Sequence, residues 1–388
     1  MKKKTLSFLV LIMFLAGTVL LPGTASAFEQ GSWKLEPSFK TEEKWDSNIF
    51  YDTEDPDSDW ITVLTPGIYG EWNFGQADKH KAFAGYDVDI GLFGEYTDQN
   101  YGNHNAYGGV NLDFNKMTFD ANNRFQFTSS RAGTEFQRRI LRKIDEANFV
   151  AGWHYNKIDF DTGYQFFITD YLSDTLDQID FYHNKVWVTG YIQIAPKTQA
   201  LLELNYKNIQ YPDASGRNGN AYAALTGIKG DITAKITGVA KAGFKVKDYN
   251  SSDANDFANF IAHIDLMYDM NERVDMMFSY HREPYESTYT NNNYYTGDHF
   301  KYNLTYDIGR NFVGKFDSFF FHNAYTSPGP GENEDRTDFE WEARPRLEYH
   351  WKEWAVFGGG YTFHQRASNV YSRKYDQHVV SADVKFMF

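Results

Sequence analysis

Most of this chain alternates between apolar and polar residues with a period of two. In 117–130, MTFDANNRFQFTSS, Phe119 and Phe125 share one parity, while Asp120 and Arg124 fall on the other. Successive side chains of a β-strand point to opposite faces, so this period predicts a strand with one apolar face and one wet face. Any fold for the chain must either bury that apolar face in a protein core or place it against lipid.

The chain hides its apolar residues in this alternation, with one exception at the N-terminus. Aromatic residues make up 18% of the sequence, yet no apolar run of helix-spanning length follows the first 27 residues. A helical membrane protein is therefore excluded. Residues 1–27 have a basic start, an apolar stretch and the small-x-small sequence Ala25-Ser26-Ala27, which predicts a secretory signal peptide cleaved before Phe28. We expect 28–388 to form a single domain.

Charge and cysteine content exclude several classes of protein. The formal net charge is −14, and the predicted signal peptide holds three lysines and no acids, so the mature charge is −14 − 3 = −17. An acidic chain without a basic stripe is a poor nucleic-acid binder, and we expect no nucleic-acid partner. The absence of cysteine excludes disulfides and thiolate metal sites.

The alternating runs predict eighteen strands. Their approximate spans are 33–50, 60–74, 81–97, 105–115, 117–131, 147–157, 158–171, 182–195, 198–211, 220–230, 232–249, 256–269, 273–287, 297–309, 312–325, 337–351, 353–367 and 376–388.

The connections between these runs alternate in length. Asn115-Lys116 and Asn156-Lys157 are short, whereas DTEDPDSD (52–59) and SPGPGENEDR (327–336) are long and polar. Short turns at one end and long loops at the other are typical of a bacterial outer-membrane barrel. The predicted fold is therefore an all-β, transmembrane, antiparallel up-and-down barrel of about 18 strands, with both termini on the periplasmic side. A large soluble β-sandwich is the alternative, because it also alternates.

In such a barrel the polar parity faces the lumen. Hydrocarbon offers the backbone no hydrogen-bond partners, and a charge near the bilayer midplane costs about 2–4 kcal/mol, so charged residues point inward. The candidate pore-lining residues are Asp87, Asp89, Glu95, Asp120, Arg124, Asp159, Asp161, Lys235, Lys241, Lys245, Glu340, Glu342, Arg344, Arg346 and Glu348. Both signs are represented, so the wall alone predicts no strong ion selectivity. Alternatively, these residues pair and only brace the wall.

One candidate loop is strongly basic. Residues 132–146 carry Arg138, Arg139, Arg142 and Lys143 at a spacing that suits a short amphipathic helix. Folded inward, the segment would place a cationic patch in the pore mouth and attract polyanions. The interpretation we favour is a surface helix or loop that contacts anionic lipid headgroups.

The C-terminus and the histidines complete the inventory. In VSADVKFMF the apolar parity includes Phe386 and Phe388, and this end resembles the terminal strand that outer-membrane assembly machinery recognises. The histidines are scattered singly, with no HExxH and no Gly-x-Ser-x-Gly. We therefore expect no enzyme, no catalytic or metal site and no cofactor.

The first strands resemble a known family. Asp46-Ser47-Asn48-Ile49-Phe50 ends an extended first strand, and a second strand carries the pattern Asp-x-Ile-x-x-Leu-x-Pro-Gly over 59–67. This arrangement is similar to the start of the putative β-barrel porin 2 family. The resemblance implies an outer-membrane barrel, and several family members accompany gene sets for capsule or exopolysaccharide export.

These observations lead to a functional expectation. We expect a monomeric channel in the outer membrane of a Gram-negative bacterium that passes polar cargo, with carbohydrate polymer export as the leading hypothesis. The expected partners are outer-membrane lipid and lipopolysaccharide, the outer-membrane assembly machinery, the polysaccharide cargo and periplasmic export components. A general diffusion porin for small solutes and a structural barrel that serves a periplasmic complex are the alternatives.

Overall fold

A computed structural model describes residues 28–133, 135–251, 256–289, 292–329 and 332–388. The predicted signal peptide lies outside these residues. The strands are β1 (Phe28–Gln30), β2 (Trp33–Asp46), β3 (Asp59–Phe74), β4 (His80–Phe93), β5 (Tyr101–Asp113), β6 (Met117–Thr128), β7 (Arg142–Tyr155), β8 (Ile158–Tyr171), β9 (Phe181–Ala195), β10 (Thr198–Gln210), β11 (Gly219–Asp231), β12 (Ile236–Tyr249), β13 (Phe257–Asn271), β14 (Val274–Glu286), β15 (Tyr294–Gly309), β16 (Phe312–Tyr325), β17 (Thr337–Lys352), β18 (Ala355–Ser368) and β19 (Tyr375–Met387).

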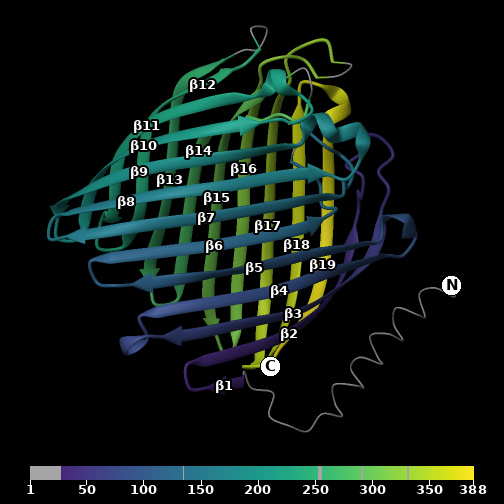
Figure 1. The fold of residues 1–388 in the computed structure, drawn as a ribbon. Helices are drawn as coiled ribbons and strands as arrows, with labels where there is room; N and C mark the ends of the chain where they lie inside the picture. The colour runs from purple at the N-terminus through teal and green to yellow at the C-terminus, as the bar shows by residue number, and fades with distance from the viewer. Residues whose placement is uncertain (1–27, 134, 252–255, 290–291, 330–331) are drawn as a thin grey trace.

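Strands β2 to β19 form one closed ring. Each pairs antiparallel with its neighbours in sequence, and β19 pairs with β2 from Val379 opposite Asp46 to Met387 opposite Ser38. The short β1 adds only to β2. Figure 1 shows the strands of the near wall crossing in front of those of the far wall, as strand tilt in a barrel requires. The predicted fold, an antiparallel barrel of eighteen strands, is confirmed.

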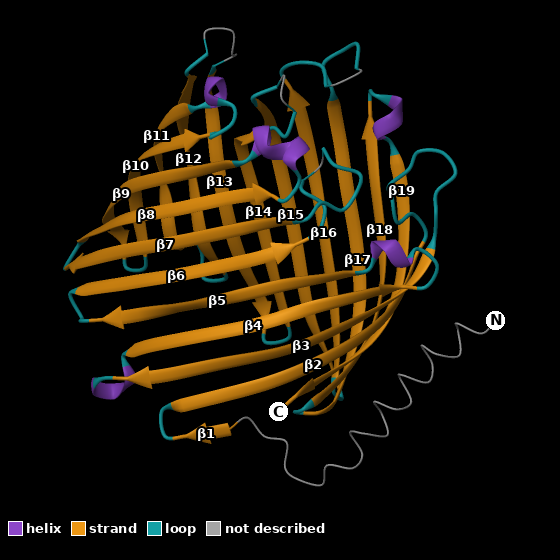
Figure 2. Ribbon diagram, turned by 45° about the vertical axis from the view of Figure 1, so that its right-hand side comes forward, coloured by secondary structure: helices purple, strands orange, loops and turns teal. Residues whose placement is uncertain are grey.

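The two ends of the barrel differ in their connections. Turns at one end are short, and residues with positive φ, such as Asn115 at 68° and Asn311 at 71°, close them. The other end carries long loops, including 47–58, 129–141 and 326–336 (Figure 2). Strand β2 begins and β19 ends at the short-turn end. The predicted asymmetry of the loops is therefore present.

Alternation along the strands separates an apolar outer wall from a polar lumen. Phe125, Phe149, Val186 and Leu204 lie on the outer parity, with between 37% and 56% of their surface exposed. Asp120 lies on the opposite parity, where Asn111 of the paired strand donates a hydrogen bond to it over 2.6 Å. Helices contribute almost nothing: in the described ranges, none is long and apolar enough to cross a membrane.

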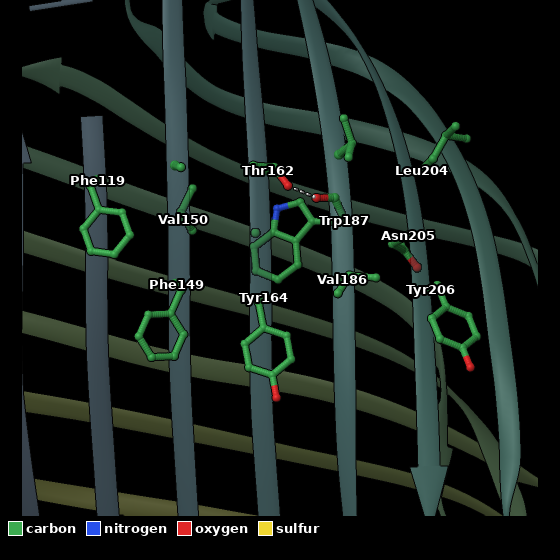
Figure 3. Close-up of a pocket in the computed structure, with 13 residues that line it drawn as sticks. Phe119, Phe149, Val150, Thr162, Tyr164, Val186, Trp187, Leu204, Asn205 and Tyr206 are labelled. Carbon is green, nitrogen blue, oxygen red and sulfur yellow. Dashed lines mark hydrogen bonds between the residues drawn. The ribbon is translucent and has the colours of Figure 1, made fainter. Parts of the chain in front are cut away.

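The outer wall is hollowed where β6 to β10 pass. A hollow of about 580 Å³ lies over Gly163, and its rim is made of Phe119, Phe149, Tyr164 and other outward apolar side chains (Figure 3). None of the residues that line the hollow is Asp, Glu, Lys or Arg. This surface suits hydrocarbon, because no charge has to be desolvated there.

Candidate functional site

The structure places most predicted pore residues on the lumenal parity of their strands, with two exceptions. Glu95 follows the end of β4 at Phe93, and its backbone N–H donates to the carboxylate of Asp59 over 3.0 Å. Lys235 precedes β12 in a short turn and donates to the carbonyl of Met270 over 2.8 Å. Neither residue belongs to a strand of the wall. The sequence predicted both as pore residues because the polar alternation extends beyond the paired residues, after β4 for Glu95 and before β12 for Lys235.

The predicted acids on β4, β6 and β8 form an acidic sector of the wall, which comprises Asp87, Asp89, Asp120, Asp159 and Asp161. Each accepts a hydrogen bond from an uncharged group. The donors are Asn105 to Asp87 at 2.9 Å, Thr65 to Asp89 at 2.6 Å, Asn111 to Asp120 at 2.6 Å, Gln199 to Asp159 at 2.5 Å and Tyr191 to Asp161 at 2.8 Å. Neutral donors orient these carboxylates without cancelling their charge.

Lysines on β9, β10 and β12 form a lysine sector, which comprises Lys185, Lys207, Lys241, Lys245 and Lys247. Lys241 pairs with Glu203 at 2.5 Å, Lys245 pairs with Glu283, and Lys247 pairs with Glu286 at 2.5 Å. Within the described part of the chain, Lys185 and Lys207 form no ion pair. Carboxylates therefore neutralise most of the charge in this sector.

Lumenal aromatic rings lie flat on glycines of the neighbouring strand. A Cβ built on Gly91 would stand 2.1 Å from the ring of Tyr101, and one on Gly163 would stand 2.0 Å from the ring of Trp187. Gly85 stands in the same relation to Tyr107, at 2.2 Å. The glycines give these rings room against the wall, so the rings do not fill the lumen.

The predicted amphipathic helix within 132–146 is wrong. Residues 129–141 form an irregular loop in their described part, and β7 begins at Arg142, which is 8% exposed. Lys143 faces outward and pairs with Asp170 of β8 at 3.1 Å. A helix does not form because Phe136 and Ile140 pack against a small cluster of Ala132, Tyr171 and Ile179, two of which belong to other segments of the chain.

Loop 129–141 turns inward and binds other loops across the barrel mouth. The Glu135 carboxylate accepts hydrogen bonds from Ser287 Oγ at 2.5 Å and from Thr288 N and Oγ1 at 2.5 and 2.7 Å. On another side, Gln137 Nε2 donates to the carbonyls of Tyr51 at 3.2 Å and Ser372 at 3.0 Å. The surface position that we favoured from sequence is therefore wrong for this loop.

Burial and hydrogen bonding act in opposite directions on Glu135. Desolvation raises the pKa of its carboxyl, which is only 5% exposed. The donors from Ser287 and Thr288 and the positive charge of Arg336 oppose that rise without cancelling it.

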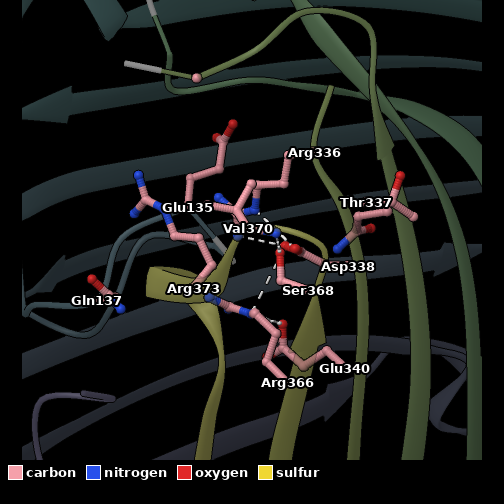
Figure 4. Close-up of polar contacts among 12 residues, drawn as sticks. Glu135, Gln137, Arg336, Thr337, Asp338, Glu340, Arg366, Ser368, Val370 and Arg373 are labelled. Carbon is pink, nitrogen blue, oxygen red and sulfur yellow. Dashed lines mark hydrogen bonds and ion pairs between the residues drawn. The ribbon is translucent and has the colours of Figure 1, made fainter. Parts of the chain in front are cut away.

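A buried ionic network lies on β17 to β19 beneath the loops (Figure 4). Arg336 and Asp338 are both fully buried and form a bidentate pair, with Nε at 2.9 Å from Oδ1. Arg366 pairs with Glu340 at 3.0 Å, and His364 lies 2.8 Å from the same carboxylate. Glu340, predicted as a pore residue, therefore braces the mouth and is not free to meet solutes.

The remaining predicted pore residues on β17 are also paired. Arg344 contacts Glu342, and Arg346 lies 2.9 Å from Glu348 and 2.7 Å from Asp383. The alternative that charged pairs brace the wall thus describes this strand well. It does not describe the acidic sector, where the hydrogen-bond donors are neutral and a histidine, His154, lies 3.5 Å from Asp159.

A chamber of about 500 Å³, here called the mouth chamber, lies below loop 129–141 against β2 and β17 to β19. Its charged lining comprises Lys40, Glu42, Lys44, Asp46, Arg131, Arg139, Asp317, Glu342, Arg344 and Arg346. The rings of Tyr51 and Tyr101 also line it. Sequence reasoning singled out three of the six cations, Arg139, Arg344 and Arg346, but missed Lys40, Lys44 and Arg131. The parity of Lys40 and Lys44 on β2 could have revealed these two, whereas no local signal marks Arg131.

The lumen and mouth offer charged and polar side chains but no metal cluster. No group of three or more His, Cys, Asp or Glu in the described ranges is placed to hold a metal ion. The arrangement can orient water, ions and small polar solutes.

Comparison with known proteins identifies the family. The sequence profile described as putative beta-barrel porin 2 matches residues 22–388. The chain belongs to the putative β-barrel porin 2 family. This family member is an outer-membrane β-barrel channel of the porin type, as the closed barrel and its apolar wall require. No curated protein matches its sequence.

Several solved structures are similar to the barrel at low sequence identity. OpdK, an outer membrane protein from Pseudomonas aeruginosa, is 10% identical, with 94% of this chain and 100% of that chain covered and a TM-score of 0.48. OccAB3 from Acinetobacter baumannii is 11% identical, with coverage of 92% and 100% and a TM-score of 0.46. The siderophore receptor PirA from Pseudomonas aeruginosa is 10% identical, with coverage of 91% and 80% and a TM-score of 0.42.

Proposed function

We propose that this barrel is a diffusion channel for small hydrophilic solutes, narrowed at its extracellular mouth by loop 129–141. The contact of Glu135 with Ser287 and Thr288 carries the proposal, since it ties the loop to the connection between β14 and β15. A loop held on both sides of the opening leaves less width than the bare barrel.

The wall below the loop supports a water-filled path. The acidic sector keeps its charge, and charged groups in contact with water avoid the cost of desolvation. The rings of Tyr107 and Trp187 lie against glycines of the wall, so these two side chains do not fill the lumen. The lumen can therefore hold water and dissolved solutes along its length.

Polymer export, which the family resemblance suggested, would require loop 129–141 to move out of the barrel mouth. A threading polysaccharide would have to displace Glu135 and Gln137 from their partners and keep them displaced. Export of carbohydrate polymer thus stays a prediction. Unchanged surface polysaccharide in a deletion strain would rule it out.

Swelling of liposomes that contain the refolded full chain tests the proposal. We expect glucose to enter quickly, and dextran to stay outside. The matched variant Glu135→Ala removes the loop contact and leaves the wall intact, so it should raise the conductance of single channels in a planar bilayer. Entry of dextran into liposomes with the wild-type protein, or the absence of any conductance, would overturn the proposal.

A further inference from the structure

We propose that the mouth chamber binds a sugar acid, a solute with one carboxylate and several hydroxyl groups. This inference rests on the proposed function, because it names the class of solute that the channel would select.

The first observation is a set of cations that no carboxylate neutralises. Lys44, Arg131 and Arg139 all line the chamber, and across the described residues none of them forms an ion pair. Lys44 is half-buried, and its ammonium group forms no hydrogen bond with the side chain or backbone of a described residue. The Nε atom of Arg139 is buried and lacks a hydrogen-bond partner. An unsatisfied buried donor is costly, and an anion in the chamber would remove that cost.

The second observation is that both guanidinium groups are held in place before any ligand arrives. Arg131 lies 3.2 Å from the centroid of the Tyr51 ring, and the ring of Tyr375 stacks on Tyr51 with its centroid at 4.3 Å. Arg139 lies 3.7 Å from the centroid of Tyr101. A guanidinium stacked on an aromatic ring loses little freedom when its edge binds a carboxylate. The chamber is thus prepared for an anion with a planar, two-oxygen head.

The third observation concerns the rest of the ligand. The carboxylates of Glu42 and Asp317 line the chamber, each with one hydrogen bond from a neighbour, from Lys40 at 2.7 Å and Asn303 at 2.6 Å. A carboxylate has about four acceptor sites, so both keep capacity for hydroxyl donors. A simple anion would leave this capacity unused, whereas the hydroxyl groups of a sugar ring would fill it.

Space for a ring comes from a glycine in the chamber wall. Gly360 lines the chamber on β18, and a Cβ built there would stand 3.4 Å from Ser381 Oγ, its nearest neighbour. Gly360 itself contributes no side chain to the wall, and the short side chain of Ser381 lies beside it. A chamber of about 500 Å³ falls in the range of small-molecule sites, which is far smaller than a polymer requires.

Calorimetry on the detergent-solubilised full chain tests the inference with three probes. D-glucuronate carries the carboxylate and the hydroxyls, glucose has only the hydroxyls, and acetate has only the carboxylate. We expect glucuronate to bind at least tenfold more tightly than either of the others. Lys44→Met and Arg139→Gln should each weaken glucuronate binding about tenfold, because a charge-assisted hydrogen bond contributes about that much.

Two further variants separate the chamber from its surroundings. Gly360→Ile fills the wall without changing any charge, so it should abolish binding. Lys185→Met removes a lumenal lysine outside the chamber, so it should leave binding unchanged. The ammonium group of Lys44 forms no hydrogen bond with a described residue, so Lys44→Met keeps the inference testable if Arg139→Gln fails to fold.

The outcomes distinguish this inference from the proposed function. Equal binding of glucose or acetate, or an equal loss in Lys185→Met and Lys44→Met, overturns the sugar-acid site. Conductance without glucuronate binding also overturns the site, yet leaves the channel. Glucuronate binding without conductance supports the site and overturns the diffusion channel.

Discussion

Two adjacent sectors of the lumenal wall use charge in different ways. In the acidic sector, carboxylates such as Asp87 and Asp120 receive hydrogen bonds from amides. In the lysine sector, Lys241 and Lys247 meet carboxylates. Both sectors lie on the lumenal parity of their strands, yet the carboxylates of the acidic sector pair with no lysine or arginine among the described residues, whereas carboxylates neutralise most lysines of the lysine sector.

This difference separates what a charge does for a solute from what it does for the fold. An amide donor leaves a carboxylate negative, so the acidic sector contributes to the electrostatic potential along the lumen. A close ion pair contributes little at a distance, but removing one partner leaves the other desolvated. We expect variants in the acidic sector to change permeation, and variants in the lysine sector to change stability.

The largest expected effect comes from breaking a pair in the lysine sector. Lys247 is 2% exposed and pairs with Glu286. Lys247→Met would leave a buried carboxylate without its cation, which costs about 3–5 kcal/mol. Asp87→Asn in the acidic sector should cost less than about 1 kcal/mol, because the new amide stays in contact with Asn105. Urea unfolding in detergent measures both, and equal losses would contradict the distinction.

The next largest effect is expected at the boundary between the two sectors, where β8 pairs with β9. Gly163 belongs to β8 and supports the ring of Trp187 on β9. Gly163→Val would push the indole into the lumen, so we expect a loss of about 1–3 kcal/mol and a lower single-channel conductance.

Gly190 provides the matched control for that substitution. It lies on β9 with its nearest neighbour, Phe160, at 3.7 Å from a built Cβ, which is ordinary contact. Gly190→Val should therefore leave conductance unchanged. An unchanged conductance in Gly163→Val would show that the ring can move elsewhere at no cost to the path.

A smaller effect should appear in ion selectivity. Asp87→Asn combined with Asp89→Asn removes two negative charges whose donors are neutral, so the reversal potential in a salt gradient should shift toward anions. Lys241→Met combined with Glu203→Gln also removes two charges, but their sum is zero. The second double variant should keep the wild-type reversal potential. A shift of the same size in both would mean that partners do not decide which charges a solute feels.

The alternation and loop lengths predicted most of the fold, because both follow from local physics. A strand that faces hydrocarbon on one side must alternate, and a two-residue connection such as 156–157 forces its strands to pair. The ends of the strands do not follow from alternation alone. Glu95 and Lys235 continue the alternation, but whether a residue is paired depends on the neighbouring strand, which their own segments do not encode.

The mouth could not be predicted for a related reason. Glu135 and Ser287 are 152 positions apart, and nothing in either segment indicates the contact. Residues 132–146 have helical spacing, yet Phe136 and Ile140 pack against Tyr171 and Ile179 of other segments, and no helix forms. Tertiary packing overrides local preference most readily in such short polar segments.

The smallest expected effect concerns the pH dependence of the mouth, where Glu135 resembles neither sector because it is both buried and held by uncharged donors. Burial raises the pKa of its carboxyl in the docked loop above the usual value for glutamate. The docked loop therefore holds a proton more tightly than an undocked loop does, so docking is most stable below the usual pKa and weakens as pH rises through the raised one. Brief openings to higher conductance should accordingly become rarer as pH falls from about 8 to about 4. Glu135→Gln, which stays neutral throughout, should remove this dependence. Openings that became more frequent in acid, or a pH response that persisted in Glu135→Gln, would show that another group controls the loop.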